Sequence, residues 1–412
     1  MFALDHKCVN CGERYPLKTE SVVCTRCEGL LEVEYDYVAM RKGFTKADLT
    51  KSRHRGLWKY AEALPVEEKS IVTLGEGFTP LVTCERLESP TPLLAKLDYV
   101  APTSSFKDRG STVAVSKAKE LGVGAVAIDS TGNAAASVSA YAARAGIPCY
   151  VFIPSYTERE KVVQVLATGA TVIKVKGTRQ DCHNVVKAAY RRFGWYYCGF
   201  MVSPYAIEGT KTIAYEICEQ LNWNSPDWIV FPVGTGSGIM GCYRGLQELL
   251  QLGWITRLPK LVCIQAEGCA PIAAAYRAGK SDIIPVKAPA TVAEGLAVGA
   301  PPKGQLVFEA LRKTQGVAET VTDQEALQTA RTLAAKEGLF VEVSSAPAVA
   351  GAIKLLHAGI IDSKDTVVCE MTGTGLKSHA EYAKMYAPAL EIEPNLESLQ
   401  KLVDSRFRIG RS

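Results

Sequence analysis

The stretch PTSSFKDRGS, residues 102–111, contains a single lysine, Lys107, between a phenylalanine and an aspartate. Two serines precede the phenylalanine, and Gly110 follows shortly after Asp108. An ordinary lysine is solvated, because its charge is costly to bury. A lysine held in a pocket can instead perform covalent chemistry. This stretch alone allows both interpretations of Lys107, so the sequence around it has to decide between them.

From about residue 70 onward, short β-branched runs alternate with helical stretches. Buried strands are predicted by GAVAIDS, IPCYVFIP, ATVIKV, DWIVFPV, KLVCIQAEG and DTVVCEMTG, and helices by NAAASVSAYAARAG and EGTKTIAYEICEQL. Thr322 and Glu325 form a capping-box pattern before a further helix. Apolar strands separated by helices of this length predict an α/β fold with parallel sheets covered on both faces. In such sheets, ligands bind at the carboxyl ends of the strands.

Polar loops follow three of the predicted strands: DSTGNAAAS at residues 129–137, PVGTGSGIMG at 232–241 and MTGTGLK at 371–377. The first loop opens a helix, whose N-terminal N–H groups attract an anion. The second is rich in glycine, which lets the backbone wrap a phosphate. Its spacing is not Gly-x-Gly-x-x-Gly, so a nicotinamide cofactor is only weakly supported. A lysine, a phosphate cradle and a carboxylate-binding helix start together favour pyridoxal phosphate and an amino-acid substrate.

Four cysteines near the start of the chain form a CxxC…CxxC pattern: Cys8, Cys11, Cys24 and Cys27. Each CxxC makes a tight turn that aims two thiolates at one point, and Gly12 and Gly29 suit such turns. Disulfides are the alternative, but they fit poorly with a chain that shows no secretory signal. The pattern predicts a structural zinc ribbon, in which the metal supplies folding free energy.

The composition of the chain indicates an enzyme-sized globular protein of 412 residues with two or three domains. Its net charge of +4 is spread along the chain without a basic block. Nucleic acid and membrane surfaces are therefore not expected as partners. The start of the chain has no cleavage signal, and no run reaches the length of a membrane-spanning helix. We expect a cytoplasmic protein.

The ordered motifs resemble those of threonine synthase and the other fold-type II pyridoxal-phosphate enzymes. The matching stretches lie between residues 74 and 377: LGEGFTPL, SSFKDRG, STGNAAAS, PYAIEGTKT, IQAEGCAP and TGTGLK. The resemblance implies two open parallel-sheet domains with the cofactor between them, a preceding zinc ribbon, and a homodimer. The predicted parts are a ribbon at 1–37, a large cofactor domain at 38–115 and 204–388, a small α/β domain at 116–203, and a tail at 389–412.

The resemblance assigns a role to individual residues of this sequence. Lys107 would bind the cofactor covalently and then remove the substrate's Cα proton. Phe106 would lie beside the ring, Asn133 would meet the 3′-oxygen, and Thr372 would meet the pyridine nitrogen. The residues that would hold the phosphate are Gly234, Thr235, Gly236, Ser237 and Gly238. Glu294, in a stretch that resembles the amino-acid dehydratases, would lie near the cofactor. The substrate-binding candidates are Ser130, Thr131, Gly132, Ala134, Phe200 and Ala206.

Some positions depart from the pattern of threonine synthases. Phe200 and Met201 occupy the places of an Asn-Ser pair that helps to hold the phosphate of O-phosphohomoserine, and Ala206 replaces an arginine. An arginine fork binds phosphate strongly and an alanine does not. These changes favour β- or γ-elimination or replacement on a small, non-phosphorylated amino acid, with or without a nucleophilic co-substrate, unless a cation such as Arg109 compensates. The alternatives are threonine synthase itself, a threonine or serine dehydratase, and an inactive cofactor-binding homologue.

Overall fold

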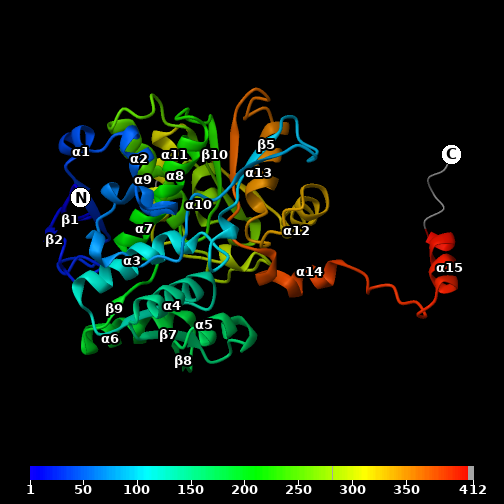
Figure 1. Cartoon of the computed structure of the whole chain (residues 1–412), viewed down its shortest axis with the longest axis horizontal. Helices are drawn as coiled ribbons and strands as arrows, with labels where there is room; N and C mark the ends of the chain where they lie inside the picture. The colour runs from blue at the N-terminus through cyan, green and yellow to red at the C-terminus, as the bar shows by residue number, and fades with distance from the viewer. Residues whose placement is uncertain (281, 407–412) are drawn as a thin grey trace. The chain divides into compact units, whose positions relative to one another are not determined.

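The computed structural model describes residues 1–280 and 282–406. The chain divides into two units, residues 1–377 and 378–412. The second unit contains α14 (His379–Met385) and α15 (Leu396–Arg406). Helix α15 falls within the stretch predicted as a tail, and residues 407–412 lie outside the described residues. The first unit contains three sheets, which Figure 1 shows from one side.

The N-terminal sheet is small and antiparallel, with the strand order β2-β1-β3. Its strands are β1 (Ala3–Cys8), β2 (Arg14–Pro16) and β3 (Leu31–Tyr35). The first CxxC turn begins at the end of β1, and Gly12 closes it in a left-handed conformation with φ of +74°. Glycine adopts this conformation without strain. Helices α1 (Tyr37–Gly43) and α2 (Lys46–Lys51) follow the sheet.

The large sheet has six strands in the order β12-β11-β10-β13-β5-β4. Its members are β4 (Leu81–Cys84), β5 (Leu93–Lys96), β10 (Trp228–Pro232), β11 (Lys260–Ala266), β12 (Val317–Val321) and β13 (Val367–Glu370). All neighbours are parallel except β4 and β5. The strands predicted from DWIVFPV, KLVCIQAEG and DTVVCEMTG are confirmed as β10, β11 and β13, and so is their parallel pairing. The edge pair β4 and β5 is antiparallel, because only a short connection joins them and a parallel pair needs a longer crossover.

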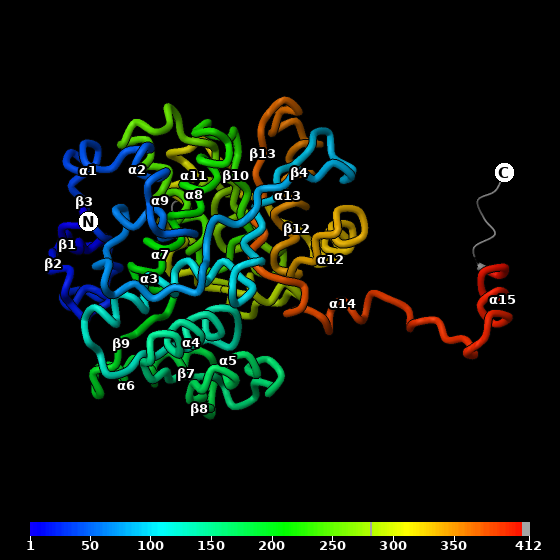
Figure 2. The backbone as a smooth tube through the Cα atoms, in the orientation of Figure 1, coloured from blue at the N-terminus to red at the C-terminus, as the bar shows by residue number. Residues whose placement is uncertain are grey.

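The second parallel sheet has four strands in the order β8-β7-β6-β9, and all its pairs are parallel. Its members are β6 (Val126–Asp129), β7 (Cys149–Pro154), β8 (Thr171–Val175) and β9 (Tyr196–Tyr197). Figure 2 traces this part of the chain together with its helices, α4 (Asn133–Ala145), α5 (Val163–Ala167) and α6 (Arg179–Phe193). The predicted helix α4 ends at Gly146, whose φ is +70°.

Helices connect and cover the sheets. Those that pack on the large sheet are α9 (Ser237–Gln251), α10 (Pro271–Arg277), α11 (Gly304–Lys313) and α13 (Pro347–His357). The capping box of Thr322 and Glu325 opens α12 (Asp323–Thr332) as predicted. Helix α3 (Lys107–Leu121) packs against both α4 and α7 (Pro204–Thr210). The single helix predicted from EGTKTIAYEICEQL is divided at Lys211 into α7 and α8 (Thr212–Gln220).

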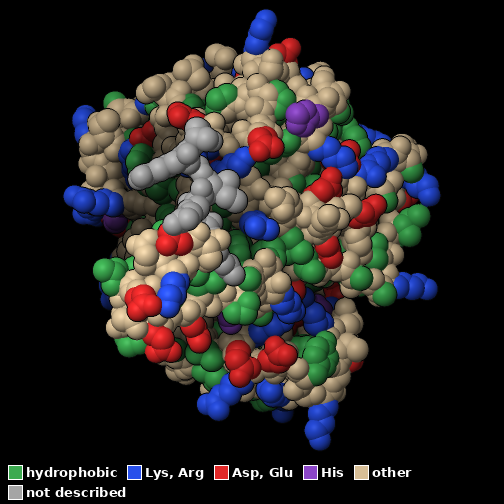
Figure 3. Space-filling view, turned by 90° about the vertical axis from the view of Figure 1, so that its right-hand side faces the viewer, with side chains coloured by type: hydrophobic (Ala, Val, Ile, Leu, Met, Phe, Trp, Pro, Cys, Tyr) green, Lys and Arg blue, Asp and Glu red, His purple; other side chains and the backbone are tan. Residues whose placement is uncertain are grey.

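Two further properties of the fold are the charge on its surface and the apolar character of its helices. In the face shown in Figure 3, positive and negative side chains are interspersed among the others. Among the described residues, no helix combines the length and the apolar character needed to cross a membrane. The division into five sequence segments stays a prediction.

Candidate active site

Lys107 is the first residue of α3, and its amine lies between two aromatic rings. Its Nζ is 4.2 Å from the ring centre of Phe106 and 4.5 Å from that of Phe200. It also donates a hydrogen bond of 3.3 Å to Ser237 Oγ. Burial of the amine lowers its pKa to about 7, although the charge of Glu342 acts in the opposite direction. Near neutral pH, Lys107 therefore has a substantial uncharged fraction that can act as nucleophile or base.

The glycine loop after β10 leads directly into α9, so it lies at a carboxyl strand end as predicted. Gly236 caps the helix with φ of +88°, and a Cβ there would lie 2.9 Å from a methyl carbon of Val307. A Cβ on Gly234 would lie 2.4 Å from the carbonyl oxygen of Gly295. Only glycine fits these positions without displacement. The first turn of α9 offers N–H groups that have no partner within the helix, which suits a phosphate.

Asn133 opens α4 and is held by two charged neighbours that sequence reasoning missed. Its Nδ2 donates to Glu342 Oε2 at 2.8 Å, and its Oδ1 accepts a bond of 2.7 Å from Lys377 Nζ. Burial raises the pKa of Glu342 and lowers the pKa of Lys377. Lys377 ends the TGTGLK motif and could have been noticed there, whereas Glu342 follows no predicted strand.

The loop after β13 contacts the start of α3. The N–H of Phe106 donates to the Thr372 carbonyl at 2.9 Å, and Thr372 Oγ1 shares a hydrogen bond of 2.8 Å with Ser345 Oγ. Ser345 Oγ also accepts from the N–H of Gly373 at 3.0 Å. Phe106, Lys107 and Thr372 are thus brought to one place from distant parts of the sequence.

The sequence of this chain is similar to those of known proteins. The family of pyridoxal-phosphate dependent enzymes matches residues 72–373. The threonine synthase of Methanocaldococcus jannaschii is 40% identical over 96% of this chain and 98% of its own length, and that of Methanosarcina acetivorans is 39% identical over 96% and 98%. The chain belongs to the threonine synthase family of pyridoxal-phosphate dependent enzymes. It is therefore an enzyme with pyridoxal phosphate as cofactor, a threonine-synthase-like lyase of amino-acid metabolism.

Solved structures show the same fold as this threonine synthase family member. Maize serine racemase aligns with a TM-score of 0.64 and 22% identity, covering 75% of this chain and 92% of that one. The L-serine ammonia-lyase of the fungus Rhizomucor miehei aligns with a TM-score of 0.63 and 23% identity, covering 75% of this chain and 98% of that one. The parallel-sheet architecture is thus that of the fold-type II pyridoxal-phosphate enzymes.

The proposed substrate residues of the family member fall into two groups. Ser130, Thr131, Gly132 and Ala134 lie at the N-terminus of α4 and are at least partly accessible, with Ser130 Oγ accepting from the N–H of Gly132 at 3.3 Å. Phe200 is 4% exposed and places its ring against Lys107. Phe200 thus contacts the lysine amine, and the substrate roles of all these residues stay predictions.

Two of the predicted site residues have surroundings other than those expected. Ala206 is fully buried inside α7. The carboxylate of Glu294 forms an ion pair of 2.7 Å with Lys161, and its side chain is 65% exposed. The backbone next to Glu294 does reach the glycine loop, because Gly295 packs against Gly234. Contact between the Glu294 carboxylate and the cofactor is therefore not supported by this geometry.

Arg109 is committed to a buried network and is not available to a substrate. Its Nε donates to Asp98 at 2.6 Å, and its two terminal nitrogens donate to Glu216 at 2.5 and 2.7 Å. Thr79 and Thr212 accept further bonds. All of these side chains are buried. The possibility that Arg109 compensates for the missing phosphate ligands is excluded by this arrangement.

Lys303, which sequence reasoning missed, lies beside the same site. It precedes α11, and its Nζ donates to the carbonyl oxygens of Phe200 at 2.9 Å and Met201 at 2.5 Å. Lys303 is 3% exposed. Burial and the charge of Lys107 together lower the pKa of its amine to about 7. No motif or strand end marks this lysine in the sequence.

The four N-terminal cysteines converge as predicted. Their sulfur atoms all lie within 4.8 Å of one another, and the neighbouring pairs are 3.5 to 3.6 Å apart. A disulfide would need about 2.05 Å, and every cysteine is a free thiol. A tetrahedral zinc ion with Zn–S bonds of about 2.3 Å separates its sulfurs by about 3.8 Å. The cluster therefore has the donor set and the spacing that suit zinc.

Proposed function

We propose that this chain converts O-phosphohomoserine and water into threonine and inorganic phosphate. The observation that carries this proposal is the end-to-end similarity to threonine synthases, at 40% identity over 98% of the length of the Methanocaldococcus enzyme. The site adds a partly neutral lysine amine beside a glycine loop. Both the elimination of phosphate and the addition of water require proton transfers at carbon, which such an amine can perform.

The residues around Lys107 fit pyridoxal phosphate. The loop at residues 234–238 would hold the phosphate, and it packs so closely on Gly295 and Val307 that a Cβ on Gly234 or Gly236 would displace it. Asn133, Thr372 and Phe106 would hold and orient the ring. When bound, the cofactor supplies an electron sink for the carbanion formed at Cα.

The protein's own groups then bind the substrate and move its protons. The N-terminus of α4, at residues 130–132, would bind the substrate carboxylate, because its N–H groups and helix dipole favour an anion. Lys107 Nζ would take the proton from Cα and transfer protons at Cβ. The rings of Phe106 and Phe200 exclude water from one side of this amine.

A second candidate is elimination from a small non-phosphorylated amino acid such as serine or threonine, which yields a 2-oxo acid and ammonia. The apolar Phe200 and the buried Ala206 support it, because neither side chain can bind a phosphate. Replacement with a nucleophilic co-substrate other than water belongs to this candidate.

Purified enzyme given O-phosphohomoserine distinguishes the two. We expect equal amounts of threonine and inorganic phosphate, and no product with the Lys107→Ala variant. If the enzyme instead leaves O-phosphohomoserine unchanged and forms a 2-oxo acid from serine or threonine, the proposal is wrong and the second candidate holds.

We further propose that zinc occupies the four-cysteine cluster and stabilises the N-terminal sheet. The supporting observation is the convergence of four free thiols within 4.8 Å. Metal analysis of the purified protein tests this, and the expected content is about one zinc per chain. A homodimer, a cytoplasmic location and the absence of nucleic-acid partners stay predictions.

A further inference from the structure

Lys303 is a buried cation whose charged neighbour is another lysine. Its Nζ contacts two backbone carbonyls, those of Phe200 and Met201. Among the described residues, no carboxylate forms an ion pair with it, and Lys107 is the charge that affects its pKa. Buried charges in proteins are normally paired, because desolvation is costly. Glu342 acts on Lys107, but Lys303 has no acid of its own in the described part of the chain, which leaves a place for an anion.

The side chain of Lys303 runs from the glycine loop to the segment of Phe200. A Cβ on Gly236 would lie 3.2 Å from the Cβ of Lys303, so the base of the side chain abuts the loop. The amine at the far end instead reaches the backbone of Phe200, whose ring contacts Nζ of Lys107. The Lys303 amine therefore lies at the segment of Phe200, which contacts the reacting lysine, at the far end of a side chain whose base abuts the loop.

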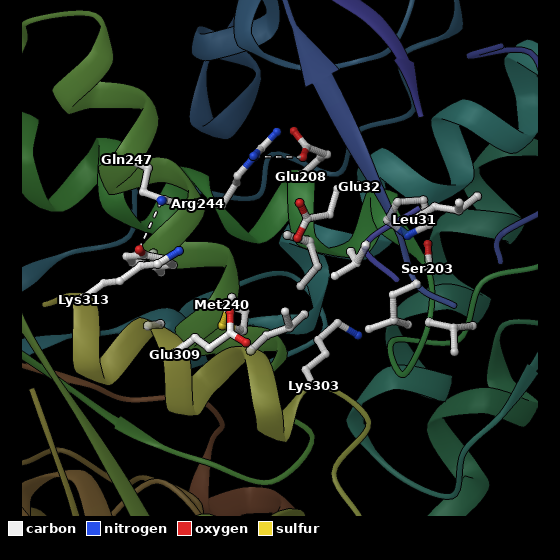
Figure 4. Close-up of a pocket in the computed structure, with 18 residues that line it drawn as sticks. Leu31, Glu32, Ser203, Glu208, Met240, Arg244, Gln247, Lys303, Glu309 and Lys313 are labelled. Atoms are coloured by element: carbon white, nitrogen blue, oxygen red, sulfur yellow. Dashed lines mark hydrogen bonds and ion pairs between the residues drawn. The ribbon is translucent and has the colours of Figure 1, made fainter. Parts of the chain in front are cut away.

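Lys303 also lines a cavity of about 280 Å³ between β3, α7, α9 and α11. In Figure 4, the Lys303 amine points toward the segment of Ser203 and away from Glu309, the acid on the same helix. Lys313, from the end of that helix, borders a different part of the cavity. Within the residues that the structure describes, none of the acids that line the cavity forms an ion pair with Lys303.

We propose that Lys303 binds the anionic group on the substrate's side chain, taking the role that the side chains of Phe200, Met201 and Ala206 cannot perform. The inference rests on the proposed function and identifies the residue that would recognise the phosphate of O-phosphohomoserine. Binding of an anion would raise the lowered pKa of Lys303 and keep it charged. An ammonium group suits this role as a strong donor of hydrogen bonds to phosphate oxygens.

The test uses holoenzyme, in which the cofactor already fills the glycine loop, and compares Lys303→Met with Lys313→Met as the matched control. We expect Lys303→Met to raise KM for O-phosphohomoserine by about 30-fold or more, the lower end of what loss of a buried charged partner costs. The Lys313→Met variant should behave as wild type, and both should keep full cofactor content. Loss of cofactor from Lys303→Met alone would overturn the proposal by assigning Lys303 to the cofactor's phosphate.

Titration calorimetry with inorganic phosphate separates this inference from the proposed function. Wild-type holoenzyme should bind phosphate, and Lys303→Met should bind it at least about 30-fold more weakly. This result supports Lys303 even if wild type does not convert O-phosphohomoserine, which would overturn only the proposed function. Equal phosphate affinity in wild type and Lys303→Met would overturn the inference even if turnover is normal.

A measurement on wild type covers the case in which Lys303→Met does not fold. Sulfate keeps a constant charge from about pH 6 to 9, whereas Lys303 loses its proton in this range. Sulfate affinity of the holoenzyme should therefore fall as the pH rises. A constant affinity would contradict the proposal, and Lys303→Arg, which keeps the charge, should retain phosphate binding.

Discussion

Lys107 Nζ donates a hydrogen bond of 3.3 Å to Ser237 Oγ, although 130 residues separate them in the chain. The contact joins the first residue of α3 to the first residue of α9. It therefore brings the amine that would carry the cofactor to the loop that would hold its phosphate. This pairing is the geometric basis of the site.

The Ser237→Ala variant tests the loop side of this pairing. Removing the hydroxyl deletes a proposed phosphate ligand and the partner of Lys107. We expect the dissociation constant of pyridoxal phosphate to rise about tenfold or more, since a hydrogen bond to a charged group contributes about 1.5 to 3 kcal/mol. Equilibrium dialysis measures it. An unchanged constant would show that the phosphate binds elsewhere.

The lowered pKa of Lys107 predicts how the cofactor-free protein takes up pyridoxal phosphate. The amine reacts only when uncharged, so the initial rate of uptake should rise with pH, with a midpoint near its pKa of about 7. Glu342 raises this pKa, so Glu342→Gln should move the midpoint to lower pH. Stopped-flow absorbance follows the uptake. A midpoint near 10, the value of a solvated lysine, would contradict the burial argument.

The buried network around Arg109 predicts a large effect on stability. Arg109→Met leaves Asp98 and Glu216 without their shared partner, and removing one member of a buried pair costs about 3 to 5 kcal/mol. Denaturant unfolding should show this loss. The exposed pair of Arg14 and Asp5 is the control, and Asp5→Asn should cost less than about 1 kcal/mol.

The same network predicts acid sensitivity. Burial opposes ionisation of Glu216, but Arg109 and Lys96 outweigh it and lower its pKa to about 2. A lowered folded-state pKa stabilises the protein above the unfolded value of about 4.3. This contribution is lost as the pH falls from about 4.3 toward 2. In that range, the unfolding free energy should therefore change less steeply with pH in Glu216→Gln than in wild type. Identical slopes in the two proteins would contradict this role of Glu216.

The four-cysteine cluster predicts a metal effect confined to the N-terminal sheet. Cys24→Ser should lower the zinc content and the melting temperature, because metal binding supplies folding free energy. Cys84→Ala, which removes a buried thiol outside the cluster, should keep its zinc. Equal zinc content in the two variants would rule out the cluster as the metal site.

The sequence predicted much of the fold because the local signals agreed with it. Continuous apolar runs identified strands such as β6 and β10, and Gly146 marked the end of α4. The antiparallel pairing of β4 escaped prediction, because its short strand lacks a distinct pattern.

The candidate site could be predicted where strand-end loops carry it, as for Ser237, Asn133 and Thr372. The positions of Lys303 and Glu342 could not be predicted, because tertiary packing alone brings them to Phe200 and Asn133. Glu294 shows the reverse case: the motif was noticed, but its carboxylate pairs with Lys161.

The most direct test of the central claim is the chemical location of the cofactor. Borohydride reduction of purified holoenzyme makes a lysine–cofactor link permanent, and peptide mass spectrometry then identifies the modified residue. The account predicts one phosphopyridoxyl group, on Lys107. Modification of Lys303 or another lysine in place of Lys107, or an active enzyme with no modified lysine, would contradict it.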